Sequence, residues 1–221
     1  MPSLVFPLDL ASFLERLPIK SIDFDLPETV SASRTEGGQV LTDTHGVRLW
    51  QGEVVLDRML PHEARSVFSL IDVARGGEAS FLISPLRYAY PANDPDGTGL
   101  SGANPEIRFL DGTDARRMAL QNMPVGYTLS RGDLLSFQYA SNPTRYALHR
   151  IVDETLVATG LGNTVTFEVR PHIEPGALVG TTVTLIKPHC KAVILPGSLQ
   201  PGRSTRFMTE GVSFQFQQTL R

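Results

Sequence analysis

Cysteine is nearly missing from this chain, since Cys190 is the only one in 221 residues. A lone cysteine can form neither an intrachain disulfide nor a CxxC metal site. No apolar run approaches the about 20 residues of a membrane-spanning helix. Residues 1–10, MPSLVFPLDL, also lack the basic start and the long apolar stretch of a secretory signal. We therefore expect no membrane contact, and synthesis and first folding in a cytoplasm.

Clusters of positive charge are also missing. The formal net charge of the chain is −3. Residues 1–88 carry 8 basic and 12 acidic side chains, residues 89–189 carry 8 and 10, and residues 190–221 carry 4 and 1. None of these segments has the density of lysine and arginine that neutralises a run of phosphates. The composition therefore argues against sequence-specific nucleic-acid binding.

Known catalytic and metal-binding motifs are absent as well. The sequence holds no G-x-S-x-G elbow, no P-loop and no paired-carboxylate motif. Asp94 and Asp96, in NDPDGTG, lack the other ligands of a helix–loop–helix calcium site and are typical of a turn. His189 and Cys190 are neighbours that would point to opposite faces of a strand, so the histidine could not activate the thiol. The histidines show no H-x-H or H-x-x-x-H ligand spacing; they are His45, His62, His149, His172 and His189.

One glycine-rich stretch invites a nucleotide-binding interpretation. Residues 158–165, ATGLGNTV, contain G-x-G, but the third glycine of a dinucleotide-binding fingerprint is replaced by Val165. Apolar and polar residues alternate directly afterwards, which is typical of a strand. The stretch therefore predicts a β-hairpin between residues 153–158 and 164–169, with Gly160 and Gly162 at positive φ. The sequence thus predicts no catalytic, cofactor-binding or metal-binding residues, no cofactor, and a protein that is not an enzyme.

Glycine and proline are plentiful, at 19 and 16 residues, and favour turns and short strands. One long helix is predicted over residues 61–75, with Pro61 at its first position and an apolar stripe that includes Phe68. A short amphipathic helix is predicted over residues 8–17, and one or two helical turns over residues 114–123. Residues 30–60 are predicted to form strands broken by turns, with a bulge or tight turn at Gly52. Further strands are predicted within residues 79–86, 106–112, 126–140, 145–160, 163–171, 181–188 and 191–197.

Two strands near the ends of the chain have the same pattern. Apolar and polar residues alternate strictly over residues 21–27 and again over residues 212–217. Pairing these strands in one sheet would make the middle of the chain an insertion. We therefore predict one domain from residues 1–88 together with 190–221, and an inserted small β-barrel or β-sandwich over residues 89–189. The predicted fold class is mainly β (α+β) with one main helix.

The order of these features resembles that of the distal tail proteins of long-tailed bacteriophages, the siphophages. Residues 31–56, SASRTEGGQVLTDTHGVRLWQGEVVL, are similar to the paired strands of that family. The helix of residues 61–75, the Gly76–Gly77 pair and the strand of residues 79–86 are similar to the unit that follows in the family. LSRGDLLSFQ, ALHRIVDETLVATGLGNTVTFEVRPHI and GTTVTLIKP resemble the strand series of its second domain. The likeness is spread over most of residues 20–217 and consists of turns and apolar positions.

The resemblance implies a structural role in the virion. It implies an N-terminal β-sandwich (belt) domain with a flanking helix, which closes with its copies into a ring of six subunits around a channel for DNA. The implied partners are the tail-tube protein, the tail-hub protein of the baseplate, and tail fibres or the tape-measure protein. The implied location is the phage tail tip, after assembly in the host cytoplasm.

Two other functions stand as alternatives to the one this resemblance implies. The first is a carbohydrate-binding β module of a host-recognition apparatus, in which aromatic side chains stack on sugar rings; the candidates are Trp50, Tyr88, Tyr90, Tyr127, Tyr139 and Tyr146. Their strand-like contexts favour core packing instead. The second is a hydrolase of the cell wall, for which the sequence supplies no nucleophile or metal ligands.

Overall fold

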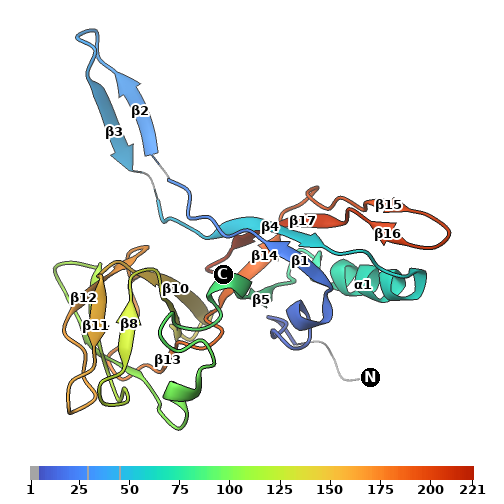
Figure 1. Cartoon of the computed structure of the whole chain (residues 1–221). Helices are drawn as coiled ribbons and strands as arrows, with labels where there is room; N and C mark the ends of the chain where they lie inside the picture. The colour runs from blue at the N-terminus through green and yellow to red at the C-terminus, as the bar shows by residue number, and fades with distance from the viewer. Residues whose placement is uncertain (1–4, 29, 45) are drawn as a thin grey trace.

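The computed structural model describes residues 5–28, 30–44 and 46–221 and consists mainly of β-strands (Figure 1). Its main helix, α1 (Pro61–Ala74), is the only α-helix among the described residues. This confirms the predicted fold class. Three short 3₁₀ turns are η1 (Leu14–Arg16), η2 (Leu86–Tyr88) and η3 (Thr98–Leu100).

The first and last strands of the chain share a five-stranded antiparallel sheet, ordered β1-β4-β17-β14-β5. β17 pairs with β4 from Ser213↔Val55 to Gln217↔Gln51, so the last strand joins the N-terminal sheet as predicted. It does not pair with β1 directly, because β4 lies between the two strands. The strands are β1 (Ile19–Ile22), β4 (Gln51–Leu56), β5 (Phe81–Ile83), β14 (Cys190–Ile194) and β17 (Ser213–Gln218).

The alternation of apolar and polar residues correctly predicted which side chains are buried near the two ends of the chain. Val212, Phe214 and Phe216 are fully buried along β17. Residues 21–26 alternate between exposed and half-buried as predicted, but the strand covers Ile19–Ile22 rather than residues 21–27, and Asp25 forms only an isolated bridge with Gln51. Gly52 is not in a turn but within β4, where a Cβ atom would lie 1.7 Å from the carbonyl oxygen of Asp23. The glycine is required there because the two backbones approach closely.

Helix α1 packs against this sheet, as its apolar stripe predicts. Ala64, Val67, Ile71 and Ala74 are buried in the same core as the sheet residues, whereas Phe68 is only half-buried at its margin. Leu60 has no side-chain acceptor to cap the helix. Instead, its backbone N–H donates to the Glu63 carboxylate over 2.8 Å. This contact satisfies a backbone donor at the helix start.

The predicted helix over residues 8–17 is wrong. The segment forms only the 3₁₀ turn η1, preceded by a turn in which the Ser12 N–H donates to the Asp9 carboxylate. Its start is extended, because Leu8 exchanges backbone hydrogen bonds with Ser80 and Leu82 beside β5. The apolar residues still reach the core, and the Phe13 ring lies 4.7 Å from that of Phe81. Contacts with distant parts of the chain thus decide the conformation of this segment, although its apolar residues have helical spacing.

Most of residues 106–184 form a six-stranded sheet ordered β13-β9-β10-β12-β7-β6. Its outer strands meet, because the Ile107 N–H donates to Thr181 O over 2.9 Å and the Gly180 N–H donates to Ile107 O over 2.8 Å. The sheet therefore curls into a near-closed barrel (Figure 1). The strands are β6 (Glu106–Leu110), β7 (Arg117–Gln121), β9 (Leu134–Tyr139), β10 (Arg145–Ile151), β12 (Phe167–Arg170) and β13 (Val183–Thr184), with a separate pair β8 (Thr128–Ser130) and β11 (Thr155–Val157).

Two predictions within the barrel are wrong. Residues 114–123 hold strand β7 rather than helical turns; Met118, Ala119 and Leu120 are all fully buried between β6 and β12. Residues 158–165 do form a tight turn, with the Thr159 N–H bonded to Asn163 O. The flanking strands do not pair, however, because β11 joins β8 while β12 joins β10 and β7. Gly162 has φ 70°, but Gly160 is not at positive φ.

The sheet and the barrel are joined by buried contacts around Trp50. This side chain is fully buried, and its Nε1–H donates to the carbonyl of Leu148 on β10 over 2.7 Å. The Arg150 guanidinium lies 5.1 Å from the indole centroid. Gln218, on β17, bonds the backbone of both Trp50 and Tyr146. The two parts of the molecule thus meet through a hydrogen-bonded joint rather than a bare linker.

Candidate assembly interface

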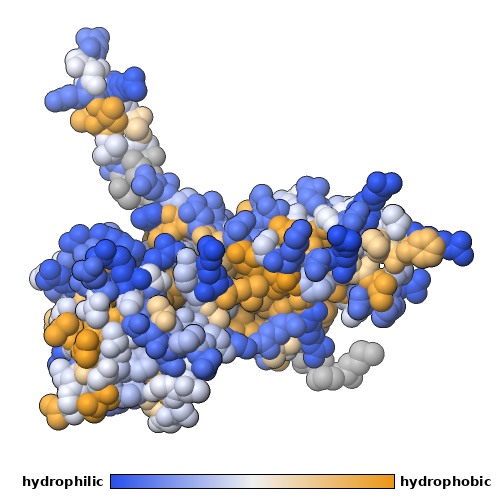
Figure 2. All heavy atoms as spheres, in the orientation of Figure 1, coloured by the Kyte–Doolittle hydropathy of each residue, from blue (hydrophilic) through white to orange (hydrophobic). Residues whose placement is uncertain are grey.

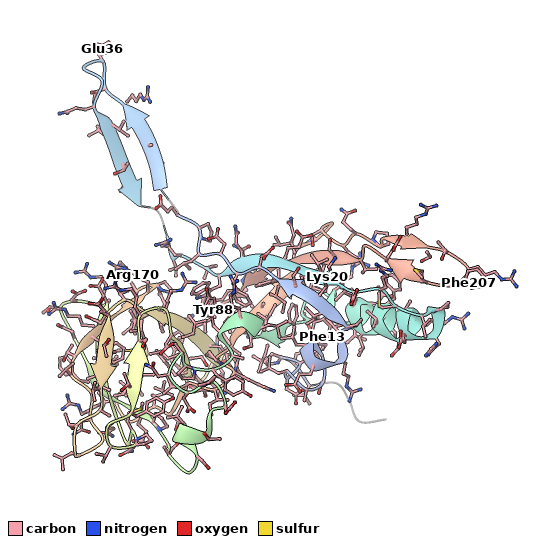
Figure 3. The ribbon with its side chains drawn as sticks, in the orientation of Figure 1. Phe13, Lys20, Glu36, Tyr88, Arg170 and Phe207 are labelled. Atoms are coloured by element: carbon pink, nitrogen blue, oxygen red, sulfur yellow. The ribbon has the colours of Figure 1, made fainter. Side chains whose placement is uncertain are left out.

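A long hairpin of strands β2 (Val30–Arg34) and β3 (Val40–Thr44) projects from the body (Figure 1). We call residues 30–44 the arm. Its turn is closed by the Thr35 N–H bonded to Gln39 O, and by the Thr35 hydroxyl, which accepts the Gln39 N–H. Gly38 supplies the positive φ of 81° that this turn requires. Glu36 marks its outer end, far from both the sheet and the barrel (Figure 3).

The arm buries almost nothing against the rest of the chain. Residues 31–43 are all exposed, including Val40 at 54% and Leu41 at 56%. These neighbours point to opposite faces of β3, so each face of the arm presents an apolar side chain. An isolated two-stranded hairpin is marginally stable at best in water. A neighbouring surface would therefore stabilise the arm.

The base of the arm is held by Arg48. Its side chain donates from Nε to Pro27 O over 3.1 Å and from Nη2 to Leu26 O. Arg48 thus joins the segment that follows the arm to the segment that precedes it. A hollow of about 520 Å³ separates this base from the barrel residues Arg116 and Arg170. Both barrel arginines already have carboxylate partners, Asp114 and Glu168. The hydrogen bonds from Arg116 hold the pKa of Asp114 at about 2.

A second hairpin extends from the opposite end of the sheet. It consists of β15 (Arg203–Ser204) and β16 (Thr209–Glu210), and its turn carries Phe207. The Phe207 side chain is 72% exposed and points away from the body (Figure 3). An exposed aromatic side chain on a formed hairpin is typical of an interface anchor.

A polar hollow of about 390 Å³ lies against the barrel strands β9, β10 and β13. In the part of the chain that the structure describes, no Asp, Glu, Lys or Arg side chain lines it; the lining residues are Ser136, Phe137, Gln138, Tyr146, Thr181, Thr182, Thr184 and His189. The Tyr146 and His189 rings lie 6.0 Å apart. This hollow offers hydroxyl groups, an amide and the half-buried rings of Tyr146 and His189 to a ligand.

The structure separates most of the residues that the sequence singled out. His45 lies outside the described residues. His62 lies on the exposed side of α1, His172 is exposed near the base of the arm, and His189 lines the polar hollow. Cys190 is fully buried, and burial raises the pKa of its thiol. Within residues 5–28, 30–44 and 46–221, no group of three or more His, Cys, Asp or Glu side chains could hold a metal ion.

The aspartates and aromatic residues also have structural surroundings. Asp94 is buried and accepts hydrogen bonds from the Gly99 N–H and the Tyr127 hydroxyl, so it shapes a turn. Burial and this bond to Asp94 raise the pKa of Tyr127. Trp50 and Tyr139 are buried and cannot stack on a sugar, whereas Tyr88 and Tyr90 are about 40% and 39% exposed. No described helix is long and apolar enough to cross a membrane.

His149 is buried on β10. Its Nδ1 lies 3.0 Å from Pro171 O, and its ring stacks on Phe137 at 5.3 Å between centroids. Among the described residues, Nε2 has no hydrogen-bond partner. Burial lowers the pKa of His149 to about 4. The imidazole is therefore neutral in the folded chain at neutral pH.

His149 should make the chain sensitive to acid. Its folded pKa lies below the about 6.5 of an unfolded histidine, so its stabilising effect is complete above pH 6.5 and falls as the pH approaches 4. We expect a loss of about 3 kcal/mol in unfolding free energy between pH 7 and pH 4 from this group. Urea unfolding at the two pH values, compared between the native chain and His149→Phe, measures it. An equal acid loss in both proteins would contradict the assignment.

No protein-family model matches the sequence. A search of curated proteins likewise finds no match.

Proposed function

We propose that this protein is a structural subunit of a long-tailed phage tail tip, a distal tail protein that forms a ring of six copies. The ring would connect the tail tube to the hub and baseplate, leave a central channel for DNA, and contact fibres or the tape-measure protein. The chain would assemble in the host cytoplasm and act in the virion. One observation carries the proposal: the arm of residues 30–44 is formed, is exposed over residues 31–43, and presents a large apolar side chain on each face, Val40 and Leu41.

Further features of the molecule support an assembly role. Projections at two ends of one sheet, the arm and the hairpin bearing Phe207, suit contacts that each subunit makes with a different neighbour (Figure 1). Such heterologous contacts close into a ring when the rotation from each subunit to the next brings the last copy back to the first. The buried joint around Trp50 would hold the barrel in one orientation on every subunit. The order of strands, helix and insertion also resembles that of distal tail proteins.

Negative-stain imaging of the purified chain at micromolar concentration tests the proposal. We expect rings with an open centre, either for the chain alone or after addition of tail-tube and hub proteins. Particles the size of single chains under all these conditions would contradict it.

The polar hollow favours a second candidate, a carbohydrate-binding barrel. A lining of hydroxyl groups and an amide beside an aromatic ring suits a neutral saccharide, because tyrosine offers both an apolar face and a polar tip. On a glycan array, the chain should then retain a neutral glycan, and Tyr146→Ala should weaken binding at least about ten-fold. Tyr90→Ala, outside the hollow, is the matched control. Absence of binding to every neutral glycan would remove this candidate.

A further inference from the structure

The hairpin of residues 203–210, which we call the knob, has a fixed tip. The Thr205 hydroxyl donates to Met208 O over 3.0 Å and accepts the Met208 N–H over 3.2 Å. The Thr205 N–H donates to the same carbonyl over 2.8 Å. Three contacts within four residues therefore define the turn that presents Phe207.

The base of the knob is fixed as well. Gly202 and Gly211 flank it at positive φ, and a Cβ atom on Gly202 would lie 2.2 Å from Glu210 O. Thr209 is buried and exchanges two backbone hydrogen bonds of 2.9 Å with Met59, which is fully buried. The knob is thus anchored in the sheet core at its base and ordered at its tip. Binding through such a rigid aromatic anchor costs little conformational entropy.

An apolar hollow of about 350 Å³ lies beside the 3₁₀ turns η1 and η2, away from the knob. Leu10, Leu14, Leu86 and Ala89 supply its apolar lining, and the Leu86 side chain is 53% exposed. At the edge of this hollow, the Glu15 carboxylate pairs with Lys187 at 2.5 Å. Orange apolar atoms gather on this face of the molecule, between the barrel and the knob (Figure 2). Figure 3 shows that Phe13 and Tyr88, neighbours of the lining residues, lie well away from Phe207.

We propose that the knob of one subunit inserts Phe207 into the apolar hollow of the next copy of this chain. The proposal rests on the ring proposed above and identifies one of its contacts. A chain cannot fill its own hollow, because its knob extends from the far end of the sheet (Figure 3). A protruding surface and a matching hollow at separate places form a heterologous contact, which repeats from subunit to subunit.

The chain itself supplies an occupant that suits an apolar hollow, because Phe207 on the knob is an exposed aromatic side chain. Arg206 adjoins Phe207 with its guanidinium carbon 5.9 Å from the ring centroid. Glu15 stands at the edge of the hollow, where it pairs with Lys187. Insertion of Phe207 would bring Arg206 of one copy towards the Glu15 carboxylate of the next, which it would share with Lys187.

Cross-linking tests this contact without removing the apolar residues. The double variant Arg206→Cys with Glu15→Cys keeps Phe207 and the hollow intact, and buried Cys190 does not compete. Under mild oxidation we expect a ladder of disulfide-linked chains ending at the closed ring, seen on a non-reducing gel. The matched control is Arg206→Cys with Leu161→Cys. Leu161 is an 85% exposed residue on the barrel. This control should give no ladder.

Native mass spectrometry of the same samples distinguishes the two proposals. Rings without cross-links in the first variant would overturn the knob contact and leave the ring in place. Single chains at every concentration would overturn the ring itself, and the knob contact with it. A second variant, Phe207→Ser, should fold normally and raise the concentration needed for assembly at least about ten-fold. Unchanged assembly of that variant would also overturn the knob contact.

Discussion

Trp50→Ala should lower the free energy of unfolding by about 3–5 kcal/mol, the range for deletion of a fully buried large aromatic side chain. The indole belongs to the same buried core as Leu134 and Leu148 of the barrel. Its loss would open a cavity where the two parts of the molecule meet. Urea unfolding followed by circular dichroism measures the change.

A milder substitution separates packing from hydrogen bonding at this joint. Trp50→Phe retains most of the apolar area but removes the N–H that bonds Leu148 O, so a buried carbonyl loses its partner. We expect a cost of about 1–3 kcal/mol. Leu161→Ala, at an 85% exposed position, serves as the control and should stay within about 0.5 kcal/mol of the native chain. A cost below 1 kcal/mol for Trp50→Ala would show that the joint is not packed as described.

Val40→Asp together with Leu41→Asp should abolish ring assembly and leave the fold intact. Both side chains are more than half exposed, so the single chain loses little when they become charged. In a ring, the same carboxylates would be buried against the neighbouring subunit without partners, which is strongly unfavourable. Size-exclusion chromatography with light scattering measures the loss of assembly, and circular dichroism measures the fold.

The control for the arm variant places similar charges elsewhere. Val157→Asp together with Leu161→Asp changes two exposed positions on the barrel, at 52% and 85% exposure. This protein should assemble as the native chain does. If the arm variant also assembled normally, the arm would not be an interface.

Local patterns in the sequence were enough to predict several elements. Strict alternation identified the buried face of β17, and the apolar stripe with Pro61 identified α1, because both signals depend on neighbouring residues alone. The segment of residues 8–17 has the same kind of stripe but forms no helix. Its conformation is decided by distant contacts, with Leu8 bonded to Ser80 and Leu82. The spacing of apolar residues within one segment does not reveal a hydrogen-bond partner that lies so far along the chain.

The candidate interface was only partly predictable. The strand pattern and the Gly37–Gly38 turn predict the hairpin of the arm, but not that it projects from the body. The knob gave a weaker signal: Phe207 and Met208 stand together within a short polar stretch bounded by Gly202 and Gly211. The partner of the Trp50 indole lies 98 residues further along the chain. No local pattern indicates a contact of that separation.

Native mass spectrometry of the intact chain at micromolar concentration tests the central claim, that this protein assembles into a ring, most directly. We expect a species with six times the mass of one chain, which persists in the Val157→Asp/Leu161→Asp control and disappears in the Val40→Asp/Leu41→Asp variant. A single-chain mass for the native protein at every concentration, with and without tail-tube and hub proteins, would contradict the claim.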